Sequence, residues 1–239
     1  MGLNATAKPK ETGASWLLMA AIGLMGAGLL VIGVNAELHR WTPPPVPPAS
    51  AARPLTAADR GATTAGPGYG HGARTAPLPR SAPVSLRIPA IGVNARVIPL
   101  GLNAAGGVEV PPLSTPFVTS WYDKGSAPGE NGPAVLLGHV DAAGVGPAVF
   151  YQLGALAPGD LVYVTRRDSR TAVFRVTAVV LYPEQDFPSK AVYSFTPNPT
   201  LRLITCGGDF DAQSHHYLGR TIAFAVYAGA RGASHPGRG

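Results

Sequence analysis

The chain has 239 residues, of which 46% are hydrophobic and only 13% are charged, so it is long and apolar enough to form a buried core. Its net charge of +6 comes from scattered Lys and Arg residues without a nucleic-acid-binding signature, which argues against an RNA- or DNA-binding protein and fits an anionic membrane or wall. The 30 glycines and 25 prolines are too many for a wholly compact chain and predict an unstructured spacer.

The first predicted element is a membrane anchor at residues 14–34, a run without any charged residue. A helix of this length spans about 30 Å, the thickness of the hydrocarbon core of a bilayer. Lys8 and Lys10 precede the run, so the positive-inside rule predicts a cytoplasmic tail at 1–13 and places the rest of the chain outside. A cleaved signal peptide is the alternative, but its apolar region is usually only about 7–15 residues long.

Residues 35–83 are rich in Pro, Gly and Ala and show no apolar periodicity. The Pro-rich start of this segment is expected to be extended and semi-rigid, and the remainder flexible. The sequence therefore predicts an extracytoplasmic linker that holds the following domain away from the membrane.

From residue 84 the pattern changes to short apolar or alternating segments separated by Gly, Pro, Asn and Asp. Seven such segments at this spacing predict an all-β domain, either a closed barrel or a sandwich, over residues 84–230, with a flexible tail at 231–239. One short helix is expected at 148–153, and the basic stretch 166–170 has the composition of a hairpin turn. The predicted strands are 84–88, 96–99, 134–140, 161–167, 172–181, 201–206 and 221–227.

Three residues at the ends of these strands have the chemistry of a catalytic site. His139 and Cys206 each end a predicted strand, and Arg220 begins another. Cys206 is the single cysteine, so no intrachain disulfide is possible. A nearby imidazolium favours the nucleophilic thiolate, and a guanidinium stabilises a developing oxyanion. Taken singly, each of these residues is more often structural, and only their combination in an exported all-β domain indicates catalysis.

The same segments resemble those of a known family. The stretch Leu-Ile-Thr-Cys ending at Cys206 resembles the sortase signature Leu-x-Thr-Cys, and Gly-His-Val-Asp around His139 is similar to the histidine motif of that family. Arg220, followed by Thr-Ile-Ala-Phe-Ala, resembles the last sortase strand with its catalytic arginine, and residues 87–93 resemble the opening strand. The motifs occur in the family's order over 84–230.

Within the family, Cys-Gly-Gly-Asp-Phe from Cys206 onward and the single anchor with its long linker look most like actinobacterial class F or class E sortases. Many class F relatives place an arginine where this chain has Leu218. Positions 218 and 220 share one face of a strand, so Arg220 is taken as the functional arginine.

The resemblance implies a barrel of about eight strands and a cysteine transpeptidase mechanism. Cys206 would attack a peptide bond of an LPxTG-like sorting signal and form a thioacyl enzyme, and His139 would move protons to the leaving amine and from the acceptor. Arg220 would bind the oxyanion, and Thr205 would orient the substrate or only favour the strand. Asp141 would support the histidine or form a turn, and the loop 182–200 would wall the substrate groove.

The implied partners are sorting-signal peptides of secreted surface proteins and an amine acceptor from a peptidoglycan precursor or a pilin, with hydrolysis when no acceptor is present. No cofactor is expected, because the possible ligands Asp209, Asp211, His215 and His216 match no metal-binding spacing.

Three other classes of protein share some of these features. An L,D-transpeptidase has a His close before the cysteine and an Arg two residues after it, whereas here position 208 is Gly. A papain-like peptidase places its cysteine before its histidine, the reverse of the order here. A stalked, non-catalytic β-barrel or sandwich that binds a partner, with Cys206 buried, is the non-enzymatic alternative.

Overall fold

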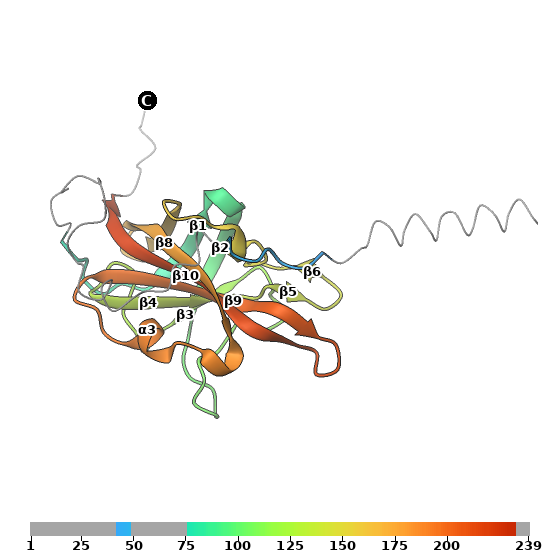
Figure 1. Ribbon diagram of the computed structural model, residues 1–239. Coiled ribbons are helices and arrows are strands. Elements are labelled where there is room, and N and C mark those ends of the chain that lie inside the picture. Colours follow the sequence, from blue (N-terminus) through green and yellow to red (C-terminus); the bar gives the residue numbers. More distant parts are fainter. Residues whose placement is uncertain (1–41, 49–75, 233–239) are drawn as a thin grey trace, which may run out of the picture. The chain divides into compact units, whose positions relative to one another are not determined.

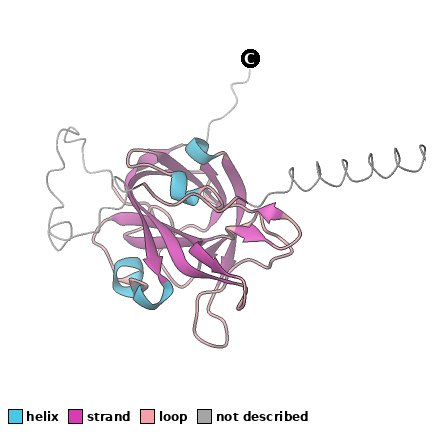
Figure 2. Cartoon of the chain, turned by 45° about the vertical axis from the view of Figure 1, so that its right-hand side comes forward, coloured by secondary structure: helices cyan, strands magenta, loops and turns pink. Residues whose placement is uncertain are grey.

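The computed structural model describes residues 42–48 and 76–232, and strands are the main regular element of this part, with only short helical turns between them (Figures 1 and 2). The main strands are β1 (Pro83–Ile88), β2 (Val93–Leu100), β3 (Thr119–Tyr122), β4 (Gly132–Leu137), β7 (Leu161–Arg166), β8 (Thr171–Pro183), β9 (Pro199–Asp211) and β10 (His216–Arg231). They close into a barrel in the order β1-β2-β3-β4-β9-β10-β8-β7, which confirms the predicted all-β barrel of eight strands.

The short elements lie between the barrel strands. They are η1 (Pro89–Ile91), β5 (Asp141–Ala142), β6 (Gly146–Pro147), η2 (Leu153–Ala155), η3 (Glu184–Asp186) and α3 (Ser189–Tyr193). β5 and β6 form a separate two-stranded hairpin directly after β4. Figure 2 shows the helical turns at the periphery of the strands.

Two of the strand pairs are parallel, and one of them positions the candidate site. β2 pairs with β3 in parallel, β4 pairs with β9 in parallel, and the other neighbours in the barrel are antiparallel. In a parallel pair both strands end at the same edge of the sheet. The carboxyl end of β4 therefore lies beside the segment of β9 that contains Cys206.

The barrel wall around β9 is apolar on both faces. Leu201 and Leu203 point into the barrel interior, where they join the main core with residues such as Phe174. Ile204 belongs to a second cluster on the outer face, which Val192 of α3 covers. Burial on both faces explains why Leu203 and Ile204, which point to opposite faces, are both apolar.

Several elements differ from the prediction in position or length. β3 was not predicted, because its four residues begin with the polar but fully buried Thr119 and Ser120. The helix expected at 148–153 is a 3-10 turn, η2, three residues long, that begins at Leu153. α3 lies inside the segment expected to be only a loop. The hairpin turn at 166–170 is confirmed by the hydrogen bond from Arg166 N to Arg170 O at 2.9 Å.

Two parts of the predicted linker contact the barrel. The fully buried guanidinium of Arg166 donates to Pro79 O at 2.5 Å and to Pro128 O at 2.6 Å, which fixes the chain just before β1. At residues 44–48, Pro44 is buried and the carbonyl of Pro45 approaches Gly154 in η2. A Cβ on Gly154 would lie 1.9 Å from that oxygen, so only glycine permits this contact.

The predicted anchor at 14–34 and most of the linker lie outside the described residues. Within the part of the chain that is described, no helix has the length and apolar character needed to cross a bilayer.

Candidate active site

Cys206 and Arg220 face each other on neighbouring strands. They are direct partners in the antiparallel register of β9 and β10. Arg220 Nη1 donates a hydrogen bond to Cys206 Sγ over 3.5 Å, and the thiol is only partly buried. The two predicted residues are therefore brought together, and the guanidinium is placed where it can stabilise negative charge on the sulfur or on an attached carbonyl.

His139 lies beside the same segment of β9. The parallel register pairs Leu137 with Ile204, and the next amide, Gly138 N, donates to Ile204 O at 3.1 Å. β4 ends at Leu137, so His139 lies two residues beyond its end, in the connection that leaves β4 beside the Cys206 segment of β9. In the strand order β4 and β10 flank β9, so His139 follows one neighbour of β9 and Arg220 lies on the other.

The orientation of the His139 ring is fixed by a backbone carbonyl. Its Nε2 donates a hydrogen bond to Pro111 O at 2.6 Å, from the connection between β2 and β3. With Nε2 as the donor, Nδ1 is the ring nitrogen that is free to accept a proton in the neutral imidazole. A carbonyl partner of this kind takes the orienting role that a carboxylate has in a Ser-His-Asp triad.

The backbone around His139 packs tightly against Val149 and Phe150. A Cβ on Gly138 would lie 2.7 Å from Val149 Cγ1 and 2.8 Å from Phe150 Cδ2, so glycine is required for this packing. Phe150 N also donates to His139 O at 2.9 Å. The chain after β4 is therefore a rigid support for the imidazole rather than a free loop.

Asp141 and Tyr217 form a second link across the site. The buried Tyr217 hydroxyl donates a short hydrogen bond to Asp141 Oδ2, joining the start of β10 to β5. Burial and this bond to a carboxylate both raise the pKa of Tyr217, which remains protonated at neutral pH. Of the two roles expected for Asp141, support of the histidine segment fits this contact.

Arg220 is held on its other side by an acidic residue. Its Nη2 donates to Glu184 Oε1 of η3 at 2.5 Å, while Nη1 reaches the thiol. One guanidinium therefore connects the nucleophile to the loop that precedes β9. This pairing fixes the direction of the remaining guanidinium N–H groups before any substrate binds.

The surroundings of Cys206 raise the pKa of its thiol. Burial is the main cause that raises its pKa above the usual value, and the charges of Glu184 and Asp141 act in the same direction. Arg220 opposes them and lowers the pKa, but does not outweigh them. A nucleophilic thiolate must therefore form by transfer of the thiol proton to a base, for which His139 is suitably placed.

These opposing charges give a prediction for Glu184→Gln. Removal of the carboxylate charge should lower the pKa of Cys206, so alkylation by iodoacetamide at pH 7 should become about twofold faster, as expected for a surface charge interaction of about 0.5 kcal/mol. The measurement is the pH dependence of the alkylation rate. Asp186→Asn, at another exposed acid of η3, is the matched control and should leave the rate unchanged. A rise of the thiol pKa in Glu184→Gln would contradict this account.

Thr205 does not lie where its predicted role needs it. Its side chain is 4% exposed and, by strand alternation, shares the inward face of β9 with Leu201 and Leu203. Its hydroxyl has no hydrogen-bond partner among the described residues. This position favours the alternative, a β-forming residue of the barrel wall, over direct contact with a substrate.

One of the four candidate metal ligands, Asp211, forms hydrogen bonds within a turn. The Asp211 carboxylate accepts hydrogen bonds from Ser214 Oγ at 2.6 Å and Gln213 N at 2.9 Å within the turn between β9 and β10. Within residues 42–48 and 76–232, no group of three His, Cys, Asp or Glu side chains is arranged to hold a metal ion.

The segment that contains α3 is attached to β9, the strand on which Cys206 lies. Arg202 on β9 is 6% exposed, stacks on Phe224 at 4.9 Å and donates through Nε to Ala191 O of α3 at 3.2 Å. Burial lowers the pKa of this arginine to about 10, so it still carries its charge at neutral pH. Arg202 fixes α3 over the outer face of β4 and β9.

Four contributors to the site were not found from the sequence: Pro111, Glu184, Arg202 and Tyr217. Pro111 contributes only a carbonyl, which leaves no sequence signal. Glu184 and Tyr217 lie far along the chain from the residues that they contact, so only the barrel register brings them together. Arg202 carried a usable signal, since a charged residue inside an apolar strand must find partners if it is buried.

Comparison with known proteins gives a family match and several similar solved structures. Residues 86–228 match the family described as the sortase domain. The SrtA sortase from Actinomyces oris aligns with a TM-score of 0.49 and 19% identity, over 70% of this chain and 93% of that chain. Sortase A from Listeria monocytogenes aligns with a TM-score of 0.47 and 20% identity, over 63% of this chain and 90% of that one. Sortase A from Corynebacterium diphtheriae aligns with a TM-score of 0.46 and 20% identity, over 63% of this chain and 62% of that chain.

Comparison with curated protein sequences gives no match. The family match covers more than half of the residues, in the part of the chain that forms the barrel. This chain therefore belongs to the sortase family of cysteine transpeptidases.

Proposed function

We propose that this protein is a membrane-anchored sortase that cleaves an LPxTG-like sorting signal and joins the acyl part to an amine. Cys206 is the nucleophile, His139 the acid–base group and Arg220 the group that binds the oxyanion. The observation that carries the proposal is the hydrogen bond from Arg220 to the Cys206 thiol at 3.5 Å, with His139 two residues beyond the end of β4, the other neighbour of β9.

The first half of the reaction forms the thioacyl enzyme. His139 takes the thiol proton as the Cys206 sulfur bonds to the scissile carbonyl carbon, and the Arg220 guanidinium stabilises the oxyanion. The carbon–nitrogen bond then breaks as His139 gives its proton to the leaving amine. Burial raises the pKa of the Cys206 thiol, which supports a role for His139 in taking the thiol proton during the attack.

The second half transfers the acyl group. The acceptor amine attacks the thioester carbonyl and His139 removes its proton. The carbon–sulfur bond breaks, an amide forms and the thiol of Cys206 is restored. Water in place of the amine gives hydrolysis. The acceptor is an amine of a peptidoglycan precursor or of a pilin.

The cellular arrangement that we propose follows from the N-terminal sequence. Residues 14–34 anchor the protein in the cell membrane with residues 1–13 in the cytoplasm, and the barrel acts outside on sorting signals of secreted surface proteins. The stretch Cys-Gly-Gly-Asp-Phe supports a class F or class E enzyme. Membrane fractionation and protease accessibility of the barrel in intact spheroplasts test this topology.

The activity is tested with the full chain in detergent, because residues 44–48 and 78–82 contact the barrel. Leu-Pro-x-Thr-Gly and Leu-Ala-x-Thr-Gly peptides are incubated with the protein, with and without an amine acceptor. Mass spectrometry should detect a thioacyl adduct on Cys206 and an amide product when the amine is present. No adduct and no cleavage with either peptide, together with a thiol inert to alkylation, would support the non-catalytic binding module instead.

A further inference from the structure

A small polar pocket lies on the outer face of β1, β7 and β8, beside the end of β10. It has a volume of about 190 Å³, below the range of about 300–1,000 Å³ that is usual for sites of drug-sized ligands. Its lining consists of two arginines, a tyrosine, three further residues with hydroxyl groups, an asparagine and a glycine, and none of these described residues is acidic or aliphatic. A pocket of this size and polarity suits a single small anionic group.

The register of the strands places the lining side chains in two adjacent rows across the barrel wall. The first row contains, from β10 to β2, Arg231, Thr171, Thr165, Ser85 and Arg96. The second row contains, from β8 to β2, Val173, Tyr163, Arg87 and Asn94. Residues that pair directly in antiparallel strands project from the same face of a sheet. The alternate residues of these strands, such as Val164 and Leu86, belong to the buried core, so both rows face outward.

Two guanidinium groups converge on the ring of Tyr163. The central carbon of the Arg87 guanidinium is 4.4 Å from the ring centroid, and that of Arg231 is 5.1 Å from it. The two charges are therefore separated by no more than about 10 Å, which is one Debye length at 0.1 M salt, and they repel each other. An anion bound between them would remove this repulsion.

The arginines of the two rows have no acidic partner. Arg87, Arg96 and Arg231 form no ion pair in the part of the chain that the structure describes. Asp168, in the turn between β7 and β8, is instead paired with Arg166 at 2.9 Å. The pocket therefore combines uncompensated positive charge with hydroxyl groups that can donate hydrogen bonds.

We propose that this pocket binds a phosphate ester group. A guanidinium binds phosphate through two parallel N–H donors, so Arg87 and Arg231 can hold such a group from two sides, with the Ser85 hydroxyl as a further donor. A phosphate monoester presents three acceptor oxygens that point in different directions, whereas a carboxylate presents two in one plane. Donors from different strands therefore suit phosphate better than a carboxylate.

The lining also distinguishes a soluble ligand from a lipid surface. Protein surfaces that lie on a membrane bury apolar side chains in it besides their basic residues. The ring of Tyr163 is the single large apolar group among the described residues of the lining, and the two guanidinium groups cover it. The favoured occupant is therefore a soluble phosphate ester rather than the headgroups of a bilayer.

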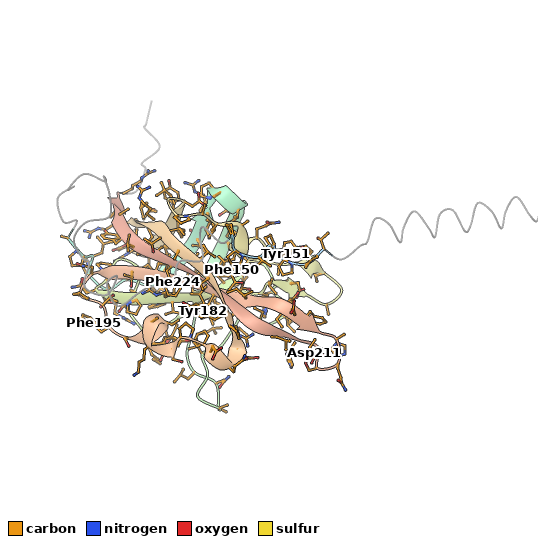
Figure 3. All side chains as sticks on the ribbon, viewed as in Figure 1. Phe150, Tyr151, Tyr182, Phe195, Asp211 and Phe224 are labelled. Carbon is orange, nitrogen blue, oxygen red and sulfur yellow. The ribbon has the colours of Figure 1, made fainter. Side chains whose placement is uncertain are left out.

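The pocket and the thiol lie on opposite sides of the barrel. β1 and β9 are four strands apart in either direction around the eight-stranded barrel. In the common view of Figures 1 and 3, β1 and β2 lie at the top, whereas Tyr182, which pairs with Arg220, and Asp211, at the end of β9, lie below them. A ligand in the pocket would therefore leave Cys206 accessible, and its binding does not depend on the reaction proposed above.

The test is phosphorus NMR with the full chain in a detergent that contains no phosphate. The protein should broaden the signal of glycerol 3-phosphate, and this ligand should raise the melting temperature because it binds the folded chain. Arg87→Gln and Arg231→Gln should each weaken binding about fivefold, as for loss of one exposed charge contact, and the double variant should lose most of the broadening. Lys190→Gln, which removes an equal charge on α3, is the matched control and should bind like the unchanged protein.

Equal broadening by the unchanged protein and the double variant would overturn the inference. Equally strong binding of acetate, measured from the width of its methyl proton signal, would also overturn it, because the pocket would then attract anions in general. Broadening of the phosphatidylglycerol signal in mixed micelles that needs both arginines, without binding of glycerol 3-phosphate, would assign the pocket to a lipid headgroup instead. Turnover of sorting-signal peptides, measured separately, should be the same in the double variant, so these outcomes leave the proposed function in place.

Discussion

Cys206→Ala should abolish both peptide cleavage and formation of the thioacyl adduct, with a loss of at least about 10⁴-fold in kcat, since loss of the nucleophile in a covalent mechanism removes the reaction path. The substitution takes away one sulfur from a partly exposed position, so the barrel should remain folded. The measurement is turnover of the sorting-signal peptides, with the melting temperature as a check of folding. Cleavage that persists in Cys206→Ala would refute the mechanism.

Arg220→Ala should lower kcat by about 10²–10³-fold with a smaller change in KM, because the lost N–H donors act mainly on charge that develops during the reaction. A second readout follows from the same contact: without the guanidinium, the pKa of Cys206 should rise further and alkylation at neutral pH should slow down. Steady-state kinetics and the alkylation rate together separate this role from a general loss of structure.

Leu218 provides the control for the identity of the catalytic arginine. Its side chain is 52% exposed, and the irregular pairing between Tyr217 and Gly219 separates it from the regular register that joins Arg220 to Cys206. Leu218→Ala should therefore retain activity. Full activity of Arg220→Ala would show that the guanidinium beside the thiol has no part in the reaction. Recovery of activity in Arg220→Ala combined with Leu218→Arg would show that either position can supply the charge.

The sequence was most informative where a local apolar pattern predicts a strand and a site residue lies at the end of that strand. The apolar run before Cys206 predicted β9, and the same run places the thiol where the outer face becomes accessible. The order of His139, Cys206 and Arg220 was sufficient to predict that they belong to one site. β4, β9 and β10 are neighbours in the barrel, and the three residues lie on or directly after these strands, so the strand order alone brings their backbones to the same part of the barrel.

The sequence was least informative where a contact depends on register between distant segments. Glu184 is 36 positions from Arg220 and in an exposed turn, and nothing in its neighbourhood marks it as a partner of the catalytic arginine. β3 was missed for a related reason, because Thr119 and Ser120 are buried through hydrogen bonds from their hydroxyls to Arg96 O and Glu109 O. Buried polar residues with hydrogen-bond partners of this kind give a strand the polar sequence that is typical of a loop.

The contact between Pro45 and Gly154 affects the distance that can separate Cys206 from the N-terminal part of the chain. Residues 44–48 and residues 78–82 both touch the barrel, so the chain is attached to it at two points, one on each side of the segment 49–75. Insertions or deletions between these two points should leave both contacts in place, because the entropic cost of joining them grows only with the logarithm of the segment length. The separation between Pro44 and Cys206 is then independent of linker length, and a longer linker would not extend the reach of the enzyme.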